Sequence, residues 1–325
     1  MIKQKTNYYK FEEFELSSGD KISLELSYQV FGLNIGEGPV VVINHSLTGD
    51  SNVSGNNGWW NELVGPGLMI DTRKFCVICI NIPGNIREKG SFNYKNNWIL
   101  NDVAKLFISL LKNLKIIKIH SIIGGSIGGG LVWEMGLLAP DYFENLIPIA
   151  ADYKASDWLI SNTYLQYLIL KNSKNPVFDA RVNAMLSYRN AKSLNKRFKL
   201  EFDDSKKRKV IDWLDYHGDK LSKNFSPQSY IHMNHLLSTI GSKQKSRNDF
   251  KKLMKKTKSS IHLLGIDSDL LFPDFEIQKT FGLILDFKKD IYYHQIKSDH
   301  GHDAFLIEFE KIESKLNYIF KIEKN

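Results

Sequence analysis

Gly124-Gly125-Ser126-Ile127-Gly128 is the stretch that decides the fold of this 325-residue chain. It follows an apolar run, Ile119–Ile123, and precedes a helix-like run, Leu131–Ala139. A G-x-S-x-G pattern between a strand and a helix is typical of a nucleophile elbow, a strained turn that exposes a serine hydroxyl. Glycines are needed there because a Cβ on either side would block that hydroxyl from a substrate. The sequence therefore predicts Ser126 as a nucleophile.

A serine hydroxyl is a weak nucleophile at neutral pH unless a histidine takes its proton and a carboxylate orients that histidine. In a fold with such an elbow, the chain order is Ser, Asp, His, each on a loop after a strand. The apolar run 261–265 leads into a loop that carries Asp267 and Asp269. Asp267 is nearer the strand, where a carboxylate suits the capping of a turn's N–H groups. We therefore favour Asp269 as the triad acid.

The general base is expected after the last strand-like run, 291–296, where the chain reads His300-Gly301-His302. This final loop is where the order Ser, Asp, His ends. The glycine before His302 frees the backbone to aim that ring, whereas His300 falls earlier in the turn. We favour His302 over His300.

Acyl transfer also needs hydrogen-bond donors for the developing oxyanion. The residue after the nucleophile supplies one N–H, here that of Ile127, and an early strand-to-loop turn supplies the other. That turn should follow the apolar run 40–44, within His45–Ser51. Because His45 precedes the nucleophile and occupies this position, we expect it to shape the loop by hydrogen bonding.

The order of apolar runs predicts a mainly parallel α/β sheet. Runs 11–16 and 22–30 read as a hairpin. Helix-length segments separate most of the later runs, as parallel strands require. These later runs begin near Val40, Phe75, Ile119, Leu146, Ile261 and Ile291. The stretch between the runs at Leu146 and Ile261 has no comparable strand and is rich in helix formers, so we predict a core of residues 1–155 and 257–325 and a helical cap, 156–256.

Composition gives the class of protein. With 42% hydrophobic residues, the chain can bury one large core plus an inserted subdomain. No 18-residue apolar run occurs and the N-terminus lacks the apolar segment of a signal peptide, so we expect a soluble, cytoplasmic protein without membrane contact. Cys76 and Cys79, in one strand-like run, should point to opposite faces, which argues against a disulfide or a metal pair.

Basic residues concentrate in the predicted cap. Residues 181–258 contain 20 Lys or Arg against 7 Asp or Glu, although the net charge of the whole chain is only +8. Runs such as Lys251–Lys256 either form a solvated surface or create a positive electrostatic field that attracts an anionic, phosphate-bearing coenzyme to the site. No nucleic-acid-binding motif accompanies the charge, so nucleic acid is not expected as a partner. His232 and His235 lack further ligands, so no metal site is expected.

Several segments together resemble the homoserine O-acetyltransferase family. They are His45–Ser51, Gly58-Trp59-Trp60 with Gly65-Pro66-Gly67, Gly124–Gly129, Ser268–Pro273 and Gly301–Leu306. The resemblance follows the family's order over most of the chain. It implies an α/β-hydrolase fold, with helices on both faces of a mainly parallel sheet and an inserted helical cap. It also implies an acyltransferase that needs no bound cofactor and uses acetyl-coenzyme A as co-substrate.

The resemblance further implies an acceptor site for a small hydroxy amino acid. Arg181–Arg189 is similar to the family's R-x-x-A-x-x-x-Y-R segment. By that likeness Arg181 binds the acceptor carboxylate, Tyr188 hydrogen bonds nearby and Asp303 takes the ammonium group. An arginine fork suits a carboxylate. The segment Phe225–Tyr230 also resembles the family's F-D-A-N-S-Y, less faithfully.

The expected mechanism is ping-pong acyl transfer through Ser126, with the Leu47 and Ile127 N–H groups stabilising the oxyanion. The loop after Gly84 is shorter and differently composed than in the family, and Gly130 stands where the family tends to have methionine. Succinyl in place of acetyl, serine in place of homoserine, and a plain serine esterase therefore stay as alternatives. A homodimer is left open.

Overall fold

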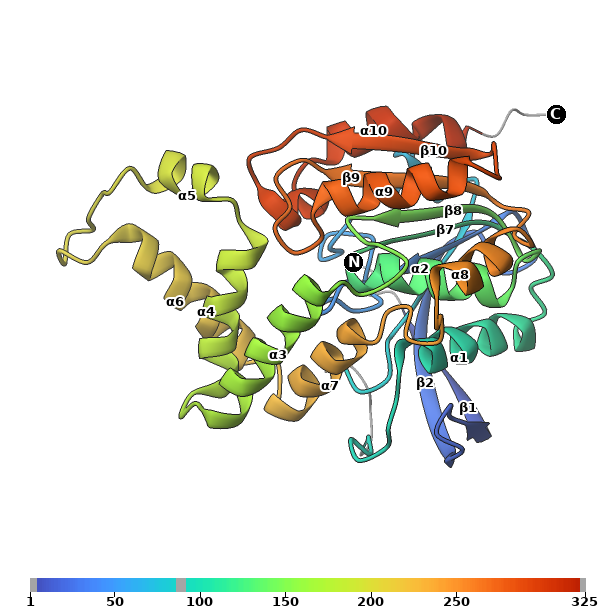
Figure 1. Cartoon of the computed structure of the whole chain (residues 1–325), viewed down its shortest axis with the longest axis horizontal. Helices are drawn as coiled ribbons and strands as arrows, with labels where there is room; N and C mark the ends of the chain where they lie inside the picture. The colour runs from blue at the N-terminus through green and yellow to red at the C-terminus, as the bar shows by residue number, and fades with distance from the viewer. Residues whose placement is uncertain (1–4, 86–91, 322–325) are drawn as a thin grey trace.

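The computed structural model describes residues 5–85 and 92–321, and an eight-stranded sheet runs through its centre (Figure 1). The strand order is β1-β2-β6-β3-β7-β8-β9-β10. The strands are β1 (Thr6–Glu15), β2 (Lys21–Gly32), β3 (Val40–Asn44), β6 (Cys76–Ile80), β7 (Ile119–Gly125), β8 (Phe143–Ile149), β9 (Ser260–Ile266) and β10 (Ile291–Ile296). Only β1 with β2 and β2 with β6 pair antiparallel. The predicted hairpin and mainly parallel sheet are confirmed.

Helices cover both faces of the sheet, and each face has its own apolar core. One core joins α1, α2 and α9 to the sheet, and the other joins α10, η2 and the segment 53–75. These elements are α1 (Leu100–Asn113), α2 (Ile127–Leu138), α9 (Asp274–Leu285), α10 (Phe309–Leu316) and η2 (Asn317–Phe320). Cys76 lies in the first core and Cys79 in the second, and both are free thiols. The two cysteines face opposite sides of the sheet, as their spacing predicts.

A run of helices lies between β8 and β9. It comprises α3 (Asp157–Asn172), α4 (Pro176–Tyr188), α5 (Ala191–Phe198), α6 (Lys209–Ser222), α7 (Pro227–Ser238) and α8 (Arg247–Met254). In Figure 1, α4, α5 and α6 stand to one side of the sheet, whereas α8 lies beside α2. Phe250 of α8 stacks on Tyr153 at 3.7 Å between ring centroids. We therefore propose that the cap ends at α7 and that α8 belongs to the core.

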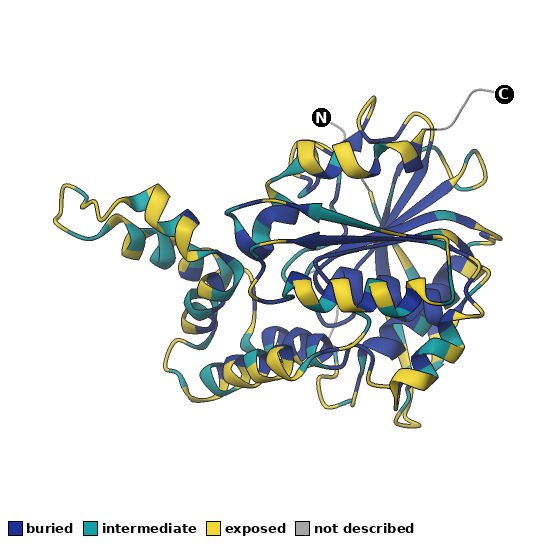
Figure 2. Ribbon diagram, turned by 45° about the horizontal axis from the view of Figure 1, so that its top comes forward, coloured by how far each residue is buried: buried dark blue, intermediate teal, exposed yellow. Residues whose placement is uncertain are grey.

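Burial follows this division (Figure 2). The strands of the central sheet are mostly buried, whereas α5 and α6 carry largely exposed or half-buried residues. A second, two-stranded sheet pairs β4 (Val64–Gly65) with β5 (Ile70–Asp71). Within residues 5–85 and 92–321, no helix combines the length and apolarity that a membrane span requires.

Candidate active site

Ser126 occupies a strained turn between β7 and α2. Its backbone φ of 61° and ψ of −129° lie in a region that L-residues rarely adopt. The Ser126 N–H donates to Ile149 O at 3.0 Å, which fixes the turn to the end of β8. A Cβ on Gly128 would lie 2.4 Å from Asn44 O, so only glycine lets α2 begin this close to β3. The strand, turn and helix predicted around the elbow are therefore present.

His302 and Asp269 meet across two loops. His302 lies in η1 (Gly301–Leu306), after β10, and Asp269 lies in the loop after β9. The distance from His302 Nδ1 to Asp269 Oδ2 is 2.7 Å. A carboxylate in this position makes Nδ1 the donor and leaves Nε2 as the ring nitrogen that can accept a proton.

The His302 ring is held by aromatic neighbours. Phe272 stacks on it at 5.6 Å, and Tyr188 lies at 5.6 Å on a tilted plane. Phe305 meets it edge-on at 5.4 Å, and a Cβ on Gly125 would lie only 2.5 Å from that phenylalanine ring. The base therefore packs against the elbow through Phe305.

Little water reaches these groups, because Ser126 is 4% exposed and His302 is 3% exposed. The Nε2 atom of His302 is buried and has no hydrogen-bond partner among the described residues. Buried polar atoms are ordinarily paired, so an unpaired one points to a functional role. This nitrogen is suited to take the Ser126 proton when a substrate completes the site.

The two predicted oxyanion donors lie at the start of α2 and in the loop after β3. Ile127 opens α2, where a helix leaves its first N–H groups without an internal acceptor. Leu47 is buried in the loop after β3. His45 anchors that loop: its Nε2 accepts from the Ile82 N–H at 2.9 Å, and its Nδ1 lies 2.7 Å from Ser46 O. Burial lowers the pKa of His45, which keeps the ring neutral. The loop-shaping role predicted for His45 is confirmed.

The alternatives Asp267 and His300 have other partners. Asp267 accepts from the Ser298 N–H at 2.9 Å and so ties the loop after β9 to the loop after β10. The expected capping of its own turn is wrong in this detail, because Asp269 Oδ1 accepts the N–H groups of Leu271 and Phe272. Asp269 therefore uses one oxygen for the turn and the other for His302. His300 Nδ1 lies 3.1 Å from Arg189 Nη2 instead.

The three residues assigned to the acceptor gather beside His302. Tyr188, at the end of α4, contacts the His302 ring, and the Arg181 guanidinium lies 5.5 Å from the Tyr188 ring centroid. Asp303 follows His302 directly in the chain. Burial raises the pKa of Asp303, and Arg181 acts against that rise. The Arg181 guanidinium and the Asp303 carboxyl thus interact electrostatically beside His302.

A family model described as alpha/beta hydrolase fold matches residues 39–309. The chain belongs to this α/β-hydrolase family. Among relatives, the homoserine O-acetyltransferase of Carboxydothermus hydrogenoformans is 27% identical over 94% of this chain and 92% of its own length. The homoserine O-acetyltransferase of Pasteurella multocida is 29% identical over 97% of this chain and 98% of its own length. The resemblance seen in the motifs therefore extends over nearly the whole sequence.

Solved structures agree on the fold. The crystal structure of homoserine O-acetyltransferase from Bacillus anthracis superposes with a TM-score of 0.87 at 17% identity, covering 100% of both chains. The crystal structure of esterase E22 also gives 0.87, at 15% identity, covering 98% of this chain and 100% of its own. An α/β-hydrolase scaffold of this shape thus occurs in a transferase and in an esterase.

Arg189 is a site residue to which the sequence analysis gave no role. It caps the C-terminal end of α4, is 6% exposed, and has its Nη1 3.7 Å from Asp303 Oδ2. The sequence signal was present, since Arg189 ends the same segment that contains Arg181 and Tyr188. Its contact with Asp303, more than a hundred residues away, cannot be read from the sequence.

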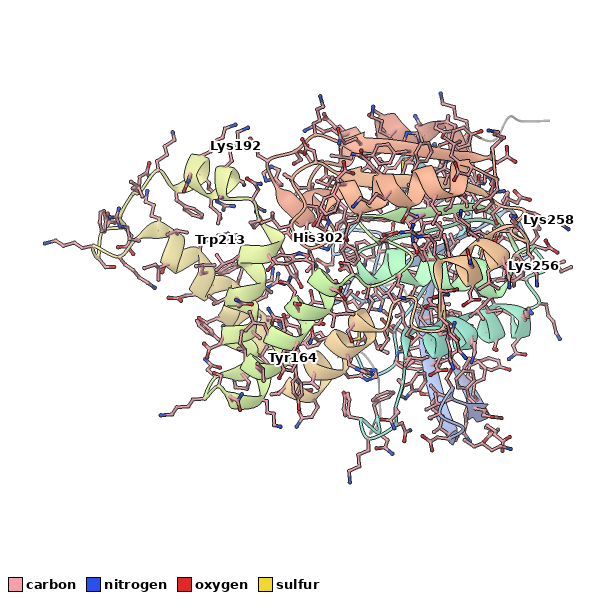
Figure 3. All side chains as sticks on the ribbon, viewed as in Figure 1. Tyr164, Lys192, Trp213, Lys256, Lys258 and His302 are labelled. Atoms are coloured by element: carbon pink, nitrogen blue, oxygen red, sulfur yellow. The ribbon has the colours of Figure 1, made fainter. Side chains whose placement is uncertain are left out.

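The lysine run of α8 does not lie over this α/β-hydrolase site. In Figure 3, His302 lies between the cap helices and the sheet, whereas Lys256 and Lys258 lie at the other end of the molecule. This position, away from His302, fits a solvated surface better than a field over the site. In the part of the chain that the structure describes, no group of three or more His, Cys, Asp or Glu side chains is arranged for a metal ion. Most of the loop whose composition departs from the family, 86–91, lies outside the described residues.

Proposed function

We propose that this protein transfers an acetyl group from acetyl-coenzyme A to the hydroxyl of L-homoserine, a step of methionine biosynthesis. The observations that carry the proposal are a strained Ser126 and a buried His302 whose Nε2 has no partner among the described residues, with Arg181 and Asp303 beside that ring. A site for simple ester hydrolysis needs the first two groups but not the last two. The names of the full-length relatives support the same choice.

In the first half-reaction, Ser126 Oγ attacks the thioester carbonyl carbon while its proton moves to His302 Nε2. The carbonyl oxygen becomes an oxyanion, which we place between the N–H groups of Leu47 and Ile127. The C–S bond then breaks, His302 gives its proton to the leaving thiolate, and an acetyl ester of Ser126 remains. Asp269 holds the imidazole in the tautomer that both proton transfers need.

In the second half-reaction, the acceptor hydroxyl gives its proton to His302 and attacks the acetyl carbonyl of the acyl-enzyme. Arg181 binds the acceptor carboxylate and Asp303 binds its ammonium group. Tyr188 forms a hydrogen bond nearby. The serine then leaves with the proton from His302. Neither step, as we propose it, requires a metal or prosthetic group.

Water competes with the acceptor, because hydrolysis would release acetate from the same acyl-enzyme. We propose that the cap, α3 to α7, excludes water by covering His302. The low exposure of Ser126 and His302 supports this role. We also keep the cytoplasm as the proposed compartment. Sedimentation velocity would distinguish a monomer from a homodimer.

The test crosses acyl donors with acceptors. Purified protein is given acetyl-, propionyl- or succinyl-coenzyme A with L-homoserine or L-serine, free thiol is followed with time, and product ester is identified by mass spectrometry. We expect O-acetyl-L-homoserine as the fastest product. Ester formation with L-serine or with a succinyl donor would support an acyltransferase activity with a different acceptor or donor.

Ser126→Ala is the matched control, because it removes one oxygen and leaves the fold of the site. It should release thiol only at the background rate. Free acetate without any ester, at saturating L-homoserine, would show an esterase and overturn the proposal.

A further inference from the structure

Arg189 joins the cap to the turn that carries the base. Its Nη2 donates to His300 Nδ1 at 3.1 Å and to Ser193 Oγ at 3.3 Å. Its Nη1 lies 3.7 Å from Asp303 Oδ2, and the guanidinium lies 5.8 Å from the Trp213 ring centroid. The side chain is only 7% exposed. One guanidinium therefore contacts the residues on both sides of the Gly301–His302 pair.

The backbone confirms that the cap and this turn fit closely. Gly301 has a φ of +64°, and a Cβ on it would lie 2.7 Å from Tyr188 O and 3.0 Å from Asn190 N. The end of α4 thus rests directly on the backbone before His302. A guanidinium held at such a contact has little freedom to move away from Asp303.

We propose that Arg189 is a positioning residue that keeps the Asp303 carboxylate charged and in place for the ammonium group of the acceptor. The inference rests on the proposed function, which assigns Asp303 to that ammonium group. It adds a specificity determinant: Arg189 controls how strongly the site prefers an amino acid over the same hydroxy acid without its amine.

The charges around Asp303 explain why it needs help. Burial raises the pKa of Asp303, while Arg181, His302 and Arg189 oppose that rise. Tyr188 also faces Asp303, and burial raises the pKa of this phenol, so it adds no charge. His300 and His217 face the arginines, and burial lowers the pKa of both rings, so they are neutral at pH 7. Removing Arg189 leaves Arg181 as the arginine partner of a buried carboxyl.

A protonated Asp303 cannot form an ion pair with an ammonium group, but Arg181 can still bind a carboxylate. The first test therefore compares L-homoserine with 4-hydroxybutyrate, which has the same carboxylate and hydroxyl and no amine. In Arg189→Ala, kcat/KM for L-homoserine should fall by about tenfold or more, and that for 4-hydroxybutyrate by less than about threefold. An equal loss for both acceptors, or a larger loss for 4-hydroxybutyrate, would contradict the inference.

Two further variants control for folding and for general cap damage. Arg189→Lys keeps a charge near Asp303 but cannot reach His300, Ser193 and Asp303 together, so it should recover only part of the preference for the amine. Arg197→Ala is the matched control, because Arg197 also lies over the Trp213 ring, at 5.6 Å, and is exposed. It should keep the preference of the wild type. If Arg189→Ala does not fold, Arg189→Lys carries the comparison.

The second test reads the Asp303 carboxyl without any turnover. The infrared band of the protonated carboxyl is assigned by its loss in Asp303→Asn and titrated in the full-length protein. In Arg189→Ala the band should persist to a pH about one unit higher or more than in the wild type. In Arg189→Lys it should stay near the wild-type midpoint. An unchanged midpoint in Arg189→Ala overturns the inference even where transfer to L-homoserine is observed. A shifted midpoint supports it where transfer is absent and only the proposed function fails.

Discussion

Single residues at this site carry two tasks at once. Asp269 uses Oδ1 to hold the N–H groups of its own turn and Oδ2 to hold His302. Ser126 is both the predicted nucleophile and the residue with the strained φ of 61° that links β7 to α2. Because the strain and the carboxylate are both fixed by backbone contacts, the site is formed before substrate binds.

The two aspartates after β9 should separate cleanly by mutation. Asp269→Asn should lower kcat on the order of 10³–10⁴-fold, because an amide can hold His302 in the wrong tautomer. Asp267→Asn should cost about 1 kcal/mol of stability through its bond to Ser298 and leave most of the turnover. Steady-state kinetics and urea unfolding of both variants measure this. The opposite pattern would make Asp267 the triad acid.

Arg181 should act in one half-reaction only. Arg181→Ala should cost roughly 2–4 kcal/mol in kcat/KM for the acceptor, because the acceptor carboxylate would lose its fork of donors. Release of coenzyme A in a single turnover should change far less, since no acceptor is present then. Stopped-flow thiol detection gives the first half-reaction and mass spectrometry the second. An equal loss in both would mean that Arg181 is structural or belongs to the coenzyme channel.

How far the sequence reaches differs from residue to residue. Ser126, Asp269 and His302 each stand in a short motif at a strand end, so neighbours in the chain reveal them. Arg189 has a partner, His300, that is 111 positions away. No local pattern reports a contact of that kind, and so the positioning role could come only from the fold.

Among the elements, strands were predicted better than the helices between them. Buried parallel strands read as continuous apolar runs, and β3 and β6 are buried at every position. The strands β4 and β5 have two residues each, too few for any periodic signal. The sequence of α8 predicts a helix but does not predict which neighbour the helix covers. In the structure, Phe250 of α8 packs on Trp133 of α2 and on Tyr153, away from α4, α5 and α6.

The strand β9, which lies between β8 and the edge strand β10, contains a pH-sensitive group. His262 of β9 lies 2.9 Å from Tyr318 OH through Nδ1 and stacks on Tyr292 at 5.0 Å. Burial lowers the pKa of His262 to about 4. The folded-state pKa thus lies below that of the unfolded chain, near 6.5. The stability from this group is present above about pH 6.5 and is lost as the pH falls toward about 4.

His262→Gln should therefore flatten the dependence of stability on pH. Between pH 6.5 and 4.5 the wild type should lose up to about 1.4 kcal/mol per pH unit more than the variant, because unfolding of the wild type takes up one more proton, on His262. Asp152, whose pKa burial raises to about 7, acts in the opposite direction in both proteins and cancels in the comparison. Urea unfolding at pH 7, 5.5 and 4.5 measures the difference. Parallel curves would show that His262 does not titrate in this way.

At the scale of the whole molecule, the lysine run 251–256 is separated in space from the candidate site. The cap stands over one side of the sheet near His302, while Lys256 and Lys258 lie at the opposite end (Figure 3). The sign of this charge can be read from the sequence but its position cannot, because the position depends on where α8 packs. A surface field falls off within about 10 Å at ordinary ionic strength.

Replacing Lys251, Lys252, Lys255 and Lys256 together with Gln should thus leave catalysis nearly unchanged. KM for acetyl-coenzyme A should change by less than about twofold, because these charges are screened from the site by distance and salt. Initial rates at low and moderate ionic strength provide the measurement. A rise in KM that grows at low salt would instead make α8 part of the donor's path.

In the proposed reaction the acyl group passes through Ser126 on its way to an amino-acid acceptor. The most direct measurement quenches the full-length protein within one turnover of acetyl-coenzyme A and finds the modified peptide by mass spectrometry, before and after a chase with L-homoserine. We expect an acetyl group on the peptide that contains Ser126, its loss during the chase, and an equal amount of O-acetyl-L-homoserine. A folded Ser126→Ala protein that still makes the ester at a near-normal rate would contradict the account.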